Sequence, residues 1–132
     1  MNLQESLDFL KLQSMSCRII EICGFLGERD GEYTAKIVKN IHPDPKNFFS
    51  INPMEMLRFI QEYKMVAIFH SHITGDSSAS DFDKINSENT IIPFLIYSLA
   101  EKKFSLYEPS DNKCNIEELK KLIWQKYLST AG

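Results

Sequence analysis

One run of five apolar residues constrains the fold of this chain more than any other feature. Residues 65–69 read Met-Val-Ala-Ile-Phe without a polar break. A strand with one face in water alternates apolar and polar residues, whereas a strand buried on both faces forms a continuous apolar run. We therefore expect residues 65–69 to form a central strand with protein packed on both faces of its sheet.

The remaining segments supply strands and helices that can surround such a strand. An Asp30-Gly31 pair between two β-rich runs predicts a hairpin. Helices are expected over the first turns of the chain and after three possible N-caps, Asn52, Ser80 and Asn115. Strands are expected at residues 19–27, 33–41, 65–69, 93–99 and 104–107. The order α-β-β-α-β-α-β-β-α predicts one α/β (α+β) domain over residues 1–132, with a mixed sheet and helices around it.

The helix after Asn52 is predicted to pack through an apolar face. Pro53 suits a first helical turn, because its missing N–H would have no partner there in any case. The apolar residues expected on one face of this helix are Met54, Leu57, Phe59, Ile60 and Tyr63. We expect this face to bury itself against the sheet.

Charge and cysteine usage argue against several classes of function. A formal net charge of -3 with scattered Lys and Arg lacks the footprint of a nucleic-acid binder. Cys17, Cys23 and Cys114 are an odd set without C-x-x-C spacing, which argues against a disulfide framework and a cysteine zinc site. We expect no secretory signal, and the longest apolar run, residues 91–100, is too short to span a bilayer. The chain is therefore expected to be cytoplasmic, with no membrane partner.

Two histidines close the central strand, and a serine and an aspartate follow at fixed spacing. His70 and His72 are two residues apart, so on a strand their side chains point to the same face. Ser80 and Asp83 are three apart, so at the start of a helix they share a face as well. Three protein ligands with an open fourth position are typical of catalytic zinc. We therefore predict that His70, His72 and Asp83 bind Zn2+.

A hydrolytic zinc site also needs a group that moves protons and a donor for the developing oxyanion. Glu21 is an acid inside the apolar strand predicted at residues 19–27, where a charge is costly unless it is paired or faces a site. Burial beside a zinc-bound water would bring its pKa toward the working range. We expect Glu21 to be the general base and Ser80 to be the oxyanion donor.

Each of these residues also has an ordinary structural interpretation. A histidine at a strand end usually lies at the surface or in a satisfied core, Ser80 can simply cap a helix, and an acid in a strand most often faces water. A calcium EF-hand loop over residues 76–88 is excluded, because Asp81 occupies the sixth position, where glycine is required. The convergence of four unusual features on one mechanism favours the zinc site.

Residues 21–26 (E-I-C-G-F-L) and the spacing His70-x-His72-x7-Ser80-x2-Asp83 resemble the JAMM (MPN+) zinc metalloprotease family. The resemblance covers about residues 1–110. It implies a single MPN-like domain with a curved mixed β-sheet flanked by helices and the zinc at the rim of the sheet. It also implies roles for five residues: zinc ligands His70, His72 and Asp83, acid/base Glu21, and Ser80 stabilising the tetrahedral intermediate.

This family cleaves peptide or isopeptide bonds, often just after the C-terminal glycine of ubiquitin or a ubiquitin-like modifier. The short interval between Asp83 and Pro93 leaves no room for the insertions with which eukaryotic deubiquitinases hold ubiquitin, so the chain looks like a minimal prokaryotic-type member. The implied substrate is a ubiquitin-like or sulfur-carrier protein, or its conjugate. The alternatives are a zinc peptidase with another target, such as phage-tail or cell-wall processing, and a non-catalytic scaffold. The oligomeric state is not predicted.

Overall fold

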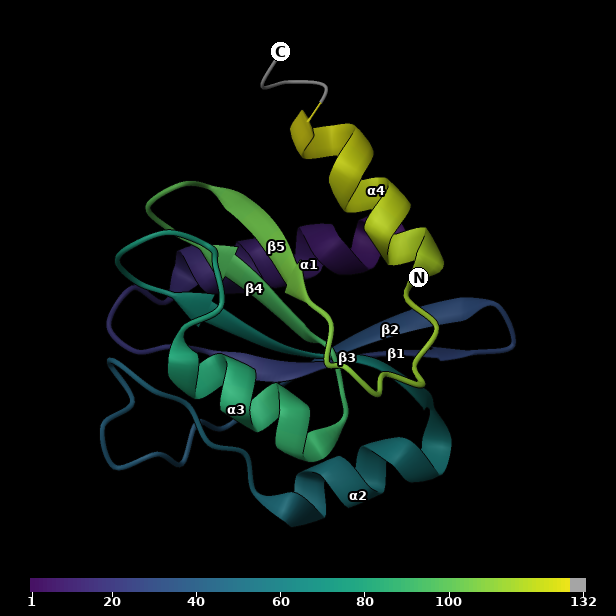
Figure 1. Cartoon of the computed structure of the whole chain (residues 1–132), viewed down its shortest axis with the longest axis horizontal. Helices are drawn as coiled ribbons and strands as arrows, with labels where there is room; N and C mark the ends of the chain where they lie inside the picture. The colour runs from purple at the N-terminus through teal and green to yellow at the C-terminus, as the bar shows by residue number, and fades with distance from the viewer. Residues whose placement is uncertain (129–132) are drawn as a thin grey trace.

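A five-stranded mixed sheet forms the middle layer of the protein in a computed structural model that describes residues 1–128 (Figure 1). Four helices flank the sheet, which confirms the predicted α+β fold. The last four residues of the predicted domain lie outside the described part. In chain order the elements are α1 (Leu3–Ser16), β1 (Cys23–Arg29), β2 (Glu32–Val38), α2 (Pro53–Glu62), β3 (Lys64–His72), α3 (Asp81–Thr90), β4 (Phe94–Ser98), β5 (Lys103–Tyr107) and α4 (Glu117–Leu128).

The predicted central strand lies in the middle of the sheet. The strand order is β2-β1-β3-β4-β5, with β3 antiparallel to β1 and parallel to β4. A parallel pair needs a crossover connection, and α3 supplies it between β3 and β4. The apolar run explains this position, because Phe69 packs in the core on one face and Ile68 in the core on the other.

Two hydrophobic cores lie on opposite faces of the sheet. On one face, α1 and α4 contribute Leu7, Leu10 and Leu119 to a cluster with Phe69. The other face carries a second cluster of buried residues: Cys23, Phe25, Phe49, Phe59, Ile68 and Phe94. Figure 1 shows α2 and α3 on the other side of the sheet from α1 and α4, and Phe59 of α2 belongs to this second cluster. None of the four described helices has the length and the apolar character that a membrane-spanning segment requires.

The predicted apolar face of α2 is confirmed for Phe59 and Tyr63 and wrong for Met54, Leu57 and Ile60. Only Phe59 is buried, whereas Met54, Leu57 and Ile60 are 52%, 44% and 48% exposed. The helix is rotated about its axis relative to this prediction, because Phe59 packs against Phe25 and over Gly27 of β1. It therefore packs on the sheet through Met56, Phe59 and Tyr63 and turns Met54, Leu57 and Ile60 to solvent.

The first strand begins later than the sequence predicts, at Cys23 rather than at residue 19. The Glu21 N–H donates to the carbonyl of Pro45 at 2.8 Å, and the Asn40 side chain donates to the carbonyl of Glu21 at 2.8 Å. These contacts with the loop after β2 replace the ladder hydrogen bonds that a longer strand would make. Glu21 consequently lies in an extended segment just before β1, at the edge of the candidate site.

Candidate metal centre

Strand β3 presents both histidines to the face that carries α2 and α3. His70 is fully buried and stacks on Phe49, a member of the core on that face. Between the histidines, Ser71 accepts a hydrogen bond from the N–H of Ile22 at 3.0 Å. The period-two alternation of a strand therefore places His70 and His72 side by side.

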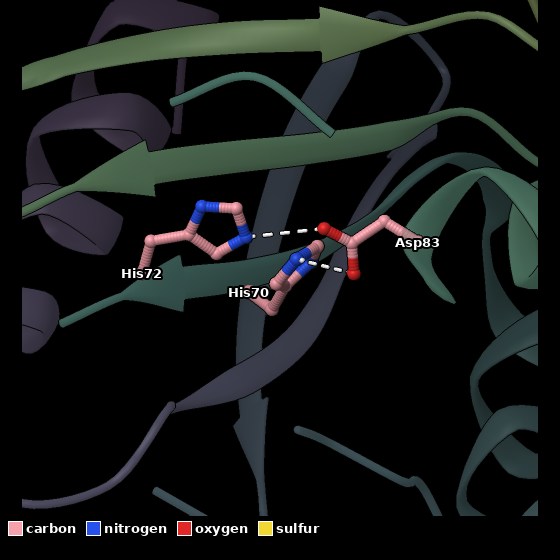
Figure 2. Close-up of side chains that lie close together, drawn as sticks. All are labelled: His70, His72 and Asp83. Carbon is pink, nitrogen blue, oxygen red and sulfur yellow. Dashed lines mark hydrogen bonds and ion pairs between the residues drawn. The ribbon is translucent and has the colours of Figure 1, made fainter. Parts of the chain in front are cut away.

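Helix α3 places the Asp83 carboxylate next to the imidazoles of His70 and His72. Ser80 caps the helix: its hydroxyl accepts from the Asp83 N–H at 3.1 Å, and its own N–H donates to Asp83 Oδ2 at 3.0 Å. Figure 2 shows the carboxylate facing both rings, with Oδ1 3.1 Å from Nε2 of His70 and Oδ2 3.1 Å from Nε2 of His72. One ligand atom from each of the three residues lies within 4.8 Å of the other two.

The donor set fits a zinc ion. Within the described chain, neither buried ring nitrogen of His70 has a hydrogen-bond partner, because its 3.1 Å approach to Asp83 lacks hydrogen-bond geometry. Orphaned buried polar atoms are rare in native proteins and need an explanation. Tetrahedral zinc with bonds of about 2.0–2.1 Å separates its ligand atoms by about 3.3 Å. The two 3.1 Å approaches of Asp83 are close to this separation, and a zinc ion held by Asp83 and the two histidines would satisfy His70.

A backbone carbonyl fixes the orientation of the second histidine. Nδ1 of His72 lies 2.9 Å from the carbonyl oxygen of Asp76. Because a carbonyl only accepts, Nδ1 must carry the proton, which leaves Nε2 of His72 to face Asp83. A ligating histidine whose other nitrogen donates to a carbonyl is the usual arrangement around protein-bound metals.

Electrostatics favour the ionisation states that a metal requires for His70 and Asp83, whereas for His72 they favour the protonated ring, whose Nε2 proton a bound metal would displace. Burial lowers the pKa of His70, which keeps this imidazole neutral. Burial alone would raise the pKa of Asp83, but the interactions with His70 and His72 hold it well below its usual range. For His72, burial is outweighed by the hydrogen bonds to Asp83 and to the carbonyl of Asp76, so its pKa is raised. The carboxylate is thus ionised and ready to share a cation with the histidines.

Glu21 faces this cluster from the extended segment just before β1, the strand that pairs with β3. Cys23 pairs with His70 in the antiparallel register, and continuing that register by two residues places Glu21 beside His72. Glu21 is 7% exposed and lines a pocket of about 300 Å³ together with His72, Asp83 and Ser80. Burial raises the pKa of Glu21 to about 8, with His72 acting against this rise and Asp83 adding to it. The structure thus gathers all five predicted site residues in one place.

Ser80 combines its helix-capping role with a position on the pocket wall. Its oxygen accepts from the Asp83 N–H, and a hydroxyl that accepts can still donate its own proton. Ser80 is exposed, so this proton can point to a group bound in the pocket. The ordinary interpretation as a cap is therefore correct, and it is compatible with the predicted role as a donor.

The raised pKa of Glu21 predicts a pH-dependent stability of the metal-free protein. Between pH 4.5 and about pH 8 the folded state holds the Glu21 proton more tightly than the unfolded state does, so stability must fall as the pH rises through this window. In Glu21→Gln this contribution disappears. We expect the variant to gain on the order of 2–4 kcal/mol relative to wild type between pH 4 and pH 8.5.

Denaturant unfolding of both metal-free proteins across this pH range measures the gain. Taking the difference between the two profiles removes the contributions of titrating groups that do not interact with Glu21. Parallel profiles would show that the Glu21 carboxyl titrates normally and is not buried as described.

Two supporting residues are absent from the sequence-based prediction. Phe49 stacks on His70 with ring centroids 4.3 Å apart, and Asp76 orients His72 through its backbone. The Gly75-Asp76 pair marks a turn, but every residue has a carbonyl, so nothing in the sequence singles out this one. The sequence likewise does not indicate which ring a phenylalanine in a loop, such as Phe49, will contact.

The fold and the site can now be compared with known proteins. The chain matches no protein-family model, and a search of curated proteins finds no match either. Among solved structures, the solution structure of protein DSY2949 from Desulfitobacterium hafniense is similar, with a TM-score of 0.62. The alignment covers 86% of this chain and 92% of that chain at 23% sequence identity. This level of similarity describes a shared fold, so the function must be argued from the site.

Proposed function

We propose that this protein is a zinc-dependent amide hydrolase of the JAMM type, a peptidase or isopeptidase. The observation that carries the proposal is the pairing of the three-residue cluster of His70, His72 and Asp83 with the buried carboxyl of Glu21 on one pocket wall. Three protein ligands leave a fourth position for water or substrate. A structural zinc site would instead be closed by a fourth protein ligand and would need no buried acid beside it.

The chemistry can be assigned to named residues. His70, His72 and Asp83 would hold a zinc ion, which when bound would lower the pKa of water and polarise a carbonyl. Glu21 takes the proton from the attacking water and passes it to the leaving nitrogen as the C–N bond breaks. Ser80 donates its hydroxyl proton to the carbonyl oxygen while negative charge develops there.

The substrate class follows from the resemblance and from the shape of the pocket. A pocket of about 300 Å³ that opens widely to solvent is accessible to an extended chain. A tail ending in glycine has this character, and such tails are the substrates of the family that the motifs resemble. We propose a ubiquitin-like or sulfur-carrier protein, or its conjugate, as substrate. We place the reaction in the cytoplasm, where the three free cysteines stay reduced.

The test is a cleavage assay with zinc-loaded protein. Ubiquitin-like proteins are fused through their terminal glycine to a reporter, and unrelated peptides of similar length serve as the comparison. We expect cleavage after the terminal glycine, loss of cleavage on chelation and recovery with zinc. Cleavage of the unrelated peptides alone would favour a peptidase with another target. Absence of cleavage despite bound zinc would favour a non-catalytic scaffold.

A further inference from the structure

The loop that orients His72 has a tightly defined shape. It spans residues 73–79 between β3 and α3, and most of it lines the pocket. Gly75 has a φ of 82°, a backbone conformation that favours glycine. The Asp76 carboxylate then accepts hydrogen bonds from both the N–H and the hydroxyl of Ser78. These local features shape the turn, but they do not tie it to the sheet.

Three side chains from the β4–β5 hairpin make that connection. The Ser98 hydroxyl donates to the carbonyl of Gly75 at 2.8 Å. The Ser105 hydroxyl donates to the carbonyl of Ser77, and the Ser77 N–H donates to Glu101 Oε1 at 2.7 Å. The backbone is therefore held on both sides of Asp76, the residue whose carbonyl contacts His72.

Ser98 also links this loop to the strand that carries the histidines. It is fully buried and pairs with His72 in the parallel register of β3 and β4. While donating to Gly75 it accepts from the N–H of Glu101 at 3.0 Å, which places the Glu101 side chain near the loop. The Leu99 N–H donates to the carbonyl of His72 at 3.0 Å. The end of β4 thus hydrogen-bonds both to the backbone of His72 and to the loop that orients the His72 ring.

We propose that Ser98, Ser105 and Glu101 are positioning residues for the metal centre. They fix the Asp76 carbonyl within hydrogen-bonding distance of the His72 ring. Nδ1 of His72 therefore donates to this carbonyl, and Nε2 of His72 points to Asp83. Any contribution of these three residues to catalysis rests on the proposed function. The orientation of the His72 ring, in contrast, is a property of the metal-free protein. If these serine hydroxyls served only to satisfy their own hydrogen bonds, removing them would leave the orientation of the His72 ring unchanged.

The test uses the double variant Ser98→Ala/Ser105→Ala and a matched control. Ser14→Ala removes another fully buried hydroxyl, which donates to the Leu10 carbonyl at 2.8 Å within α1. In the metal-free protein, NMR should detect a protected Nδ1–H proton of His72 in wild type and in the control, and lose it in the double variant. Zinc affinity, measured by competition with a chromophoric chelator, should fall about 10- to 100-fold in the double variant alone.

A second variant keeps the test informative if the double variant does not fold. Glu101→Ala removes the acceptor for the Ser77 N–H from a side chain that is 37% exposed, and should weaken both signals in the same direction. Glu101→Gln keeps an acceptor oxygen and should restore both. An unchanged Nδ1–H signal and zinc affinity in these folded variants would overturn the inference. A wild-type protein that binds zinc but cleaves no amide would refute the proposed function and leave this inference intact.

Discussion

Replacing His70 with alanine should greatly weaken zinc binding and, with it, amide hydrolysis. This imidazole is fully buried, its ring nitrogens have no hydrogen-bond partner in the described chain, and it lies 3.1 Å from the Asp83 carboxylate. Apparent zinc-binding energies of about 10–16 kcal/mol in four-ligand sites imply several kcal/mol for each ligand. We therefore expect zinc affinity to fall by about a hundred- to a thousand-fold in His70→Ala.

Asp83→Asn is the companion variant. It removes the negative charge but keeps an oxygen that can accept from the Ser80 N–H, so α3 should stay capped. The matched control is His42→Ala, because His42 is the third histidine and lies outside the cluster, where its ring packs at a tilt against Phe48. Competition with a chromophoric chelator measures all three affinities. Wild-type affinity in both ligand variants would place the zinc elsewhere.

The second large effect is expected from Glu21→Gln, which should lower kcat for amide hydrolysis by about 10²- to 10⁴-fold. Glutamine has nearly the same shape but cannot take a proton from water. Glu21 lines the pocket and is absent from the three-residue cluster, so the variant should bind zinc within a few-fold of wild type. The combination of lost turnover and retained metal distinguishes a base from a ligand.

Single-turnover cleavage and zinc titration of the same preparations measure both properties. Glu62→Gln, an exposed acid on α2, serves as the control and should behave as wild type. Two results contradict the assignment in different ways. Unchanged kcat in Glu21→Gln would exclude Glu21 as the base, and loss of zinc would make it a ligand.

Much of this architecture was predictable because local periodicity specifies it. A continuous apolar run can only be a strand buried on both faces or part of a buried helix, and residues 65–69 are too short for the latter. The i, i+2 spacing of His70 and His72 on that strand and the position of Asp83 in the first turn of a capped helix were enough to predict a cluster. The structure places all three as the spacing suggests.

Other features depend on contacts between distant segments, which local patterns do not encode. The periodicity of α2 is amphipathic, yet Met54 and Leu57 face solvent because the helix packs through Phe59 on Phe25 and Gly27. The first strand is shortened because Asn40 and Pro45 take the hydrogen bonds of the Glu21 backbone. Both differences arise from contacts between segments far apart in the chain, which no periodic pattern predicts.

The most direct test of the account is anomalous diffraction at the zinc edge from crystals grown with one equivalent of zinc. We predict a single strong peak within about 2.0–2.2 Å of Nε2 of His70, Nε2 of His72 and one oxygen of Asp83. The fourth ligand should be a water on the side of Glu21. A peak at another position, or a fourth protein ligand that closes the site, would contradict the proposal of a hydrolytic zinc centre.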